Sequence, residues 1–195
     1  MKSKNLVGTT CALMAGMMAA GSLFAAPAAA SAPRETCVVA EDWNYQQEAS
    51  RLLKEVQVHA NALSSEADVL FIYARGSISR HSHAIQVNLV KDRVNAVGKP
   101  LNRLQAIRHV AAPWQRQAID SVVPIAASLA AQTEAAIQHL NETGKPLWAP
   151  DYTDLLRSIS DRSDQVKTTI DLHLDLAGTQ EKLEDLRGRV NQIGS

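Results

Sequence analysis

Apolar residues recur at alternating intervals of three and four positions along two stretches of the chain. This spacing keeps side chains on one face of a helix and is typical of long helices that pack along a shared seam. No stretch shows the alternating β-branched pattern of a strand. The sequence therefore predicts an all-α fold. The first seam comprises Leu53, Val56, Ala60, Leu63, Ala67, Leu70 and Ala74, and the second comprises Val87, Val90, Val94, Val97, Leu101 and Leu104.

Glycine, proline and capping residues between the apolar stretches predict where the helices begin and end. Gly76 is expected to end the first helix in the left-handed conformation, and Ser77 or Ser79 to cap the second. Pro113 suits the first turn of a third helix, and Gly178 is a candidate break near the end of a fourth. Short connections force neighbouring helices to be antiparallel, so we expect an up-down-up-down four-helix bundle over residues 41–193. The predicted helices span residues 41–74, 79–109, 113–143 and 150–190.

Two prolines lie inside the predicted second and third helices. Pro100 and Pro124 each remove a backbone donor, so a kink is expected at both positions. They lie equally far from the turn between the two helices, which would let this hairpin curve as a unit. The alternative is that residues 98–100 form a loop that divides the second helix. The apolar register continues across this segment and favours the kink.

The first 30 residues are typical of a cleaved signal peptide. Lys2 and Lys4 give a positive start, and residues 11–26 are small and apolar. This apolar run is shorter than the roughly 20 residues that a membrane-spanning helix needs. We expect cleavage after Ala30 in preference to Ala32, because the second site would leave a proline next to the cut. The predicted organisation is a signal peptide at 1–30 and a flexible lead-in at 31–40 before the bundle, in a periplasmic or secreted protein that has no transmembrane anchor after cleavage.

The composition that remains after cleavage excludes several classes of protein. Cys37 is then the only cysteine, so it is either free or bridges two copies, and the fold depends on packing alone. Without Lys2 and Lys4 the chain has 18 Lys and Arg against 20 Asp and Glu, a net charge of −2. This balance gives no indication of nucleic-acid binding. There is no motif for haem attachment, a diiron centre, a phosphate loop or a nucleophile elbow, so no cofactor is expected and the chain is not expected to be an enzyme.

Histidines and aspartates nevertheless converge at one end of the predicted bundle. His83 begins the second helix, His139 lies near the end of the third, and Asp151 and Asp154 begin the fourth. Imidazole and carboxylate are ligands that zinc accepts, so these four residues are a candidate metal site. The alternative is that they are solvated side chains at the end of a bundle, because a metal site needs three or four convergent ligands.

The chain from Arg75 to Ala118 is strongly basic, with a local charge of +7. Such a stripe could bind an anionic partner, for example a headgroup layer or another protein. The alternative is that it lies beside the more acidic first helix and forms weak surface ion pairs with it. The candidate residues for an anionic partner are Arg80, Lys91, Arg93, Lys99, Arg103 and Arg108.

Long apolar seams without a reaction centre indicate an exported, non-enzymatic helical-bundle protein of the cell envelope. Its expected role is structural or in protein interaction, with self-association as one option. The alternative is a small metal-binding bundle that uses the histidines described above.

Overall fold

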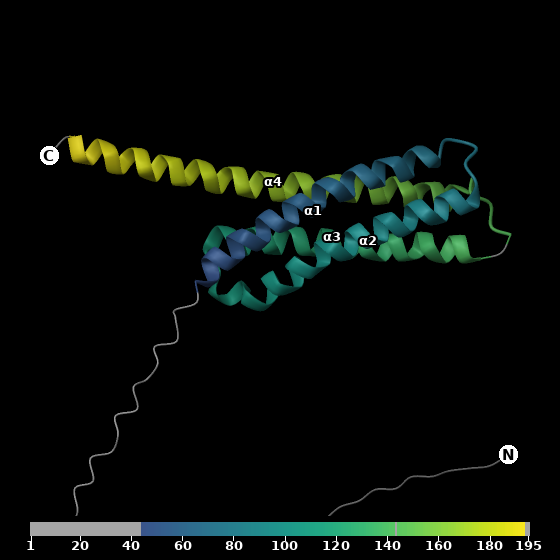
Figure 1. Cartoon of the computed structure of the whole chain (residues 1–195), viewed down its shortest axis with the longest axis horizontal. Coiled ribbons are helices and arrows are strands. Elements are labelled where there is room, and N and C mark those ends of the chain that lie inside the picture. Colours follow the sequence, from purple (N-terminus) through teal and green to yellow (C-terminus); the bar gives the residue numbers. More distant parts are fainter. Residues whose placement is uncertain (1–43, 143, 194–195) are drawn as a thin grey trace, which may run out of the picture. The chain divides into compact units, whose positions relative to one another are not determined.

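The computed structural model of the chain describes residues 44–142 and 144–193. All elements in this part are helices (Figure 1). The predicted signal peptide at 1–30, the lead-in at 31–40 and Cys37 lie outside the described residues. The expected all-α fold with four helices that pack against one another is confirmed. The elements are α1 (Tyr45–Tyr73), α2 (Arg80–Ile107), the short 3-10 helix η1 (Arg108–Val110), α3 (Pro113–Asn141) and α4 (Pro150–Ile193).

The helix ends follow from local chemistry, with two corrections to the sequence predictions. Ser79 caps α2, as its hydroxyl accepts a hydrogen bond from the Ser82 N–H at 3.1 Å. Gly76 does not end α1 in the left-handed conformation, since the cap residue Ala74 is right-handed, with φ −60°. Among the described glycines only Gly144, between α3 and α4, has a positive φ, of 88°. The expected break at Gly178 is also absent, because α4 continues to Ile193.

The core is built from the two seams that the sequence predicts. In α1 and α2 every seam residue is buried except Ala74 and Val94, which are partly buried and pack against the core. Helices α3 and α4 close this core with their own apolar faces. Burying a leucine or valine side chain contributes about 1.5–3 kcal/mol, so this shared core is the main source of stability. The helix pairs that pack against each other are α1 with α2, α2 with α3, α3 with α4, and α1 with α4.

Polar side chains at the margin of the core fasten α1 to α4. The Ser64 hydroxyl donates to Asp164 at 2.6 Å, and the Ser160 hydroxyl donates to Asp68 at 2.8 Å. Serine and aspartate exchange places between the two helices in these contacts. Both carboxylates therefore gain a specific partner, and the two helices are fixed in one register.

Both internal prolines lie inside continuous helices. Pro100 is buried within α2, and Pro124 lies within α3. The alternative in which residues 98–100 form a loop is therefore wrong. Neither proline has an N–H to donate to the carbonyl four residues earlier, which is the physical basis of the kinks that the sequence predicts.

The C-terminal part of α4 differs from the rest of the bundle. Its last core residue is Ile170, and Leu174 packs against the core from its edge. Beyond this point α4 extends past the ends of the other three helices (Figure 1). From Thr179 to Ile193 every residue is exposed. Within the part of the chain that is described, no helix is both long and apolar enough to cross a membrane.

Candidate functional site

The predicted histidine cluster exists at one end of the bundle, and an unpredicted tyrosine lies at its centre. His83 comes from the first turn of α2 and His139 from the last turn of α3. Tyr152, in the first turn of α4, lies against both. Its hydroxyl is 3.1 Å from the Nδ1 atom of His83, and its ring stacks on His139 with the centroids 4.5 Å apart. The phenol therefore fills the space in which a shared metal would have to lie.

The two aspartates of the predicted metal site are placed at the rim of this cluster. An oxygen of Asp151 lies 3.8 Å from the Nδ1 atom of His139, whereas Asp154 faces Arg157 at 3.7 Å. Among the described residues, no group of three or more histidine, cysteine, aspartate or glutamate side chains is arranged to hold a metal ion. The four predicted ligands are thus not brought together as one set.

Burial sets the protonation states of the pair at the centre. Desolvation lowers the pKa of His83, and nearby Arg80 lowers it further, although a hydrogen bond to the backbone of Tyr73 acts in the opposite direction. Desolvation also raises the pKa of Tyr152. Both groups are therefore neutral near pH 7, and the phenol can donate to the imidazole nitrogen. With Tyr152, His83 and His139 only 0 %, 1 % and 4 % exposed, the cluster has no open face for a substrate and fastens three helices together.

The lowered pKa of His83 predicts that the bundle becomes less stable in mild acid. The unfolded chain takes up a proton at His83 near pH 6.5, the ordinary value, whereas the folded chain does so only at lower pH. Between these two values the unfolded state binds more protons, so the free energy of unfolding falls as the pH drops below about 6.5. Urea unfolding at about pH 7.5 and pH 5.5 should show this loss. His83→Gln should reduce the dependence, and His81→Gln, at an exposed position, should keep it; equal slopes in all three proteins would contradict the assignment.

The four arginines among the six basic residues proposed for an anionic partner are engaged within the chain. Arg103 forms two hydrogen bonds with the largely buried Glu48, at 2.7 and 3.2 Å. Arg108 pairs in the same two-point manner with Asp120. These contacts leave less positive charge available to an external anion than the sequence indicates. The other two engaged residues are Arg80, which donates to the backbone carbonyls of Leu140 and Lys145, and Arg93, which lies 3.8 Å from Glu66.

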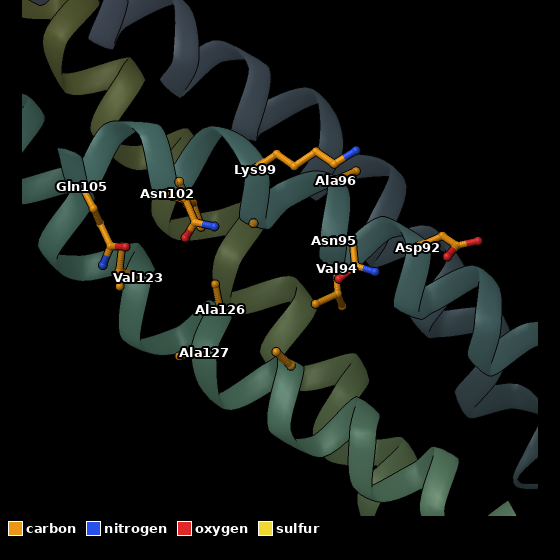
Figure 2. Close-up of a pocket in the computed structure, with 13 residues that line it drawn as sticks. Asp92, Val94, Asn95, Ala96, Lys99, Asn102, Gln105, Val123, Ala126 and Ala127 are labelled. Atoms are coloured by element: carbon orange, nitrogen blue, oxygen red, sulfur yellow. The ribbon is translucent and has the colours of Figure 1, made fainter. Parts of the chain in front are cut away.

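The two lysines of the basic stripe are placed differently from the arginines. The Nζ atom of Lys91 donates to Asn88 on its own helix at 3.2 Å. Lys99 lies at a groove of about 820 Å³ between α2 and α3 (Figure 2). Small side chains of α3 shape this groove, with Ala126 and Ala127 opposite the amide side chains of α2. It is lined by Asp92, Val94, Asn95, Ala96, Gly98, Lys99, Leu101, Asn102, Gln105, Val123, Ala126, Ala127 and Ala130.

An exposed apolar stripe runs along the C-terminal part of α4, and we call it the α4 stripe. Its large residues are between 50 % and 87 % exposed. They follow one another at intervals of four and three, with Thr179 filling the one polar position. The sequence predicts a break near Gly178, and this expectation hides the stripe, although the spacing rule that locates the bundle seams also locates the stripe. The α4 stripe comprises Leu172, Leu176, Thr179, Leu183, Leu186, Val190 and Ile193.

Comparisons with protein-family models, with curated proteins and with solved structures gave no match to this chain.

Proposed function

We propose that this chain is an exported, non-enzymatic four-helix bundle of the cell envelope that acts as a protein-interaction module. The observation that carries the proposal is the α4 stripe, since a helix that extends beyond its own bundle with an apolar face in water has a surface suited to another protein. Soluble proteins seldom expose contiguous apolar patches without such a use. The rest of the chain serves as a stable base for this helix.

Two further observations support the proposal. The side chains best suited to acid–base chemistry, His83 and Tyr152, are used in packing at the closed end of the bundle. Hydrogen bonds and ion pairs within the chain also engage the four arginines proposed for an anionic partner. An antiparallel, up-down-up-down course of the helices is part of the proposal. It is supported by the start of α1 contacting the end of α2, through Glu48 and Arg103, while Glu66 near the end of α1 contacts Gln86 near the start of α2.

The proposal is tested by removing the part of the α4 stripe that lies beyond Ala177 while leaving the bundle intact. A chain that ends after Ala177 retains all buried core residues, so its circular dichroism per helical residue and its melting temperature should stay close to those of the full chain. Both proteins, immobilised, are exposed to envelope extract of the source organism, and the retained proteins are identified by mass spectrometry.

We expect a protein, which can be the chain itself, to be retained by the full chain and lost from the truncated one. Val58→Glu is the matched control, because it places a charge on an exposed apolar position of α1 that lies outside the α4 stripe, and it should retain the same protein. Identical retention by the full and truncated chains, or retention by neither, would contradict the proposal.

A further inference from the structure

The α4 stripe has the repeat of a coiled coil, and it is separate from the face that α4 presents to its own bundle. From Leu172 to Ile193 the intervals are four, three, four, three, four and three, which is the a/d pattern of a heptad. Counted in this register, Leu176, Leu183 and Val190 take a positions. Leu172, Thr179, Leu186 and Ile193 take d positions. At 1.5 Å per residue, the stripe is about 32 Å long.

The bundle-facing stripe of α4 does not continue into this region. Continued at its own alternating intervals from Ile170, it would include Gln180 and Glu184, which are exposed and polar. Each residue of the α4 stripe precedes the corresponding position of the bundle-facing stripe by one residue, for example Leu183 instead of Glu184. One residue corresponds to a rotation of about 100° around the helix axis. The exposed leucines thus form a second apolar face of α4 and are not a continuation of the bundle-facing stripe.

The continuous helix also indicates that this face is covered. Gly178 and Gly188 lie within it, and each costs roughly 1 kcal/mol of helix stability relative to alanine. A side-chain carbon at either glycine would meet no atom within 4 Å, so neither is needed for close packing within the chain. Most helices in proteins owe their stability to the packing of an apolar face. For the C-terminal part of α4, the chain itself supplies no such packing partner among the described residues.

The charged residues that flank the α4 stripe indicate which partner covers it and in which orientation. Asp175, Lys182 and Arg189 take g positions, and His173, Gln180 and Arg187 take e positions. In a parallel pair of copies, g residues face the e residues five positions further along the other copy. Lys182 would then face Arg187 twice, and Asp175 would face the uncharged Gln180. A parallel pair therefore has repulsion without a compensating attraction.

An antiparallel pair of copies matches six of the seven positions of the α4 stripe and also the charged positions. When Leu176 of one copy lies opposite Leu186 of the other, Leu172 lies opposite Val190 and Thr179 opposite Leu183. The g residues then face each other, so that Asp175 meets Arg189 of the second copy in two equivalent places. Lys182 meets its own copy once, near the two-fold axis, and this is the one contact between two like full charges. The e residues also face each other, so that Gln180 meets its own copy and Arg187 meets His173 of the second copy.

We propose that two copies of this chain associate through their α4 stripes as an antiparallel coiled coil. The inference rests on the proposed function and specifies its partner as a second copy. The interface is isologous, as expected for a two-fold dimer. The two bundles lie at opposite ends of the shared coiled coil, because each α4 emerges from its bundle at residues 170–175 and runs towards the other.

The association is tested by sedimentation equilibrium of the protein purified after export. We expect a monomer–dimer equilibrium with a dissociation constant below about 100 μM, the range of a weak but specific complex. The double variant Leu183→Glu with Leu186→Glu should raise this constant by more than about 100-fold, since it places charges in four layers of the interface. Val58→Glu should leave it unchanged. A wild-type chain that remains monomeric, or one that forms trimers, would overturn the proposal.

The orientation is tested by exchanging charges. Asp175→Arg and Arg189→Asp should each raise the dissociation constant by about tenfold, because each turns two attractive pairs into repulsive ones. The double variant should return close to the wild-type value, because it restores both pairs with the charges reversed. In a parallel dimer residues 175 and 189 are about 21 Å apart along the axis and no recovery is possible. Additive losses in the double variant would therefore overturn the antiparallel arrangement.

These outcomes separate the inference from the proposed function. A monomeric chain that still retains a different envelope protein through the α4 stripe contradicts the second copy as occupant and leaves the interaction module in place. A monomeric chain whose truncation after Ala177 changes nothing contradicts both.

Discussion

Tyr152→Ala is expected to lower the free energy of unfolding by about 3–5 kcal/mol, the cost typical of removing a buried aromatic ring. The ring is fully buried, contacts side chains from two other helices, and stacks on His139. Its removal leaves a cavity at the point where α2, α3 and α4 meet. It also leaves the Nδ1 atom of His83 without the hydroxyl that lies 3.1 Å away. Because native domains have only about 5–15 kcal/mol of stability, this single change should consume a large share of it.

Two controls separate the contributions of the ring and its hydroxyl. Tyr152→Phe keeps the ring and removes the hydrogen bond, so it should cost about 1–3 kcal/mol. Trp148→Ala removes a larger ring nearby that is mostly exposed, and it should change stability by no more than about 0.5 kcal/mol. All three variants are compared by urea unfolding followed by circular dichroism. A Tyr152→Ala loss as small as that of Trp148→Ala would contradict the role given to the histidine–tyrosine cluster.

The sequence was sufficient to predict the helices because their signals are local. The spacing of Leu53, Leu63 and Leu70 in α1 identifies a buried face without knowledge of what covers it. Ser79 and Pro113 mark helix starts through backbone groups within three or four residues of themselves. These determinants do not depend on the tertiary structure, so they could be read before it was known.

The chemistry at the histidine end could not be predicted in the same way. The spacing placed His83, His139 and the start of α4 at one end of the bundle, and this placement agrees with the structure. It could not determine which residue of the first turn of α4 turns inward. Asp151 and Asp154 flank Tyr152, and the helix phase fixed by Leu156 and Ile159 buries the tyrosine and leaves both aspartates exposed.

The basic stripe shows a second limit of sequence reasoning. Arg103 is charged in the sequence whatever its surroundings, but its partner Glu48 lies 55 positions away. Whether such a side chain serves an external anion or the fold depends on contacts between distant segments. We therefore propose that the apolar residues of α4, and not the basic residues of α2, bind a partner. Their periodic spacing is visible in the sequence, and the structure shows that they are exposed.

The same substitution at two positions of α4 is expected to lower the free energy of unfolding by very different amounts. Leu156 is fully buried and Leu183 is 50 % exposed. Leu156→Ala should cost about 2–5 kcal/mol, because it removes core contacts and leaves a cavity. Leu183→Ala should cost less than about 0.5 kcal/mol when unfolding is measured on dilute protein, because in the monomer this side chain contacts mainly water.

The contrast should change with protein concentration if α4 joins two copies. A partner that binds only the folded chain stabilises it by mass action, so the wild type gains stability as the concentration rises. Leu156→Ala should gain in parallel with the wild type, since its substitution lies outside the α4 stripe, whereas Leu183→Ala should gain less. Urea unfolding at low and high protein concentration measures both quantities. A large loss for Leu183→Ala in dilute solution would mean that the C-terminal part of α4 packs against its own bundle, because only contacts within one chain survive dilution.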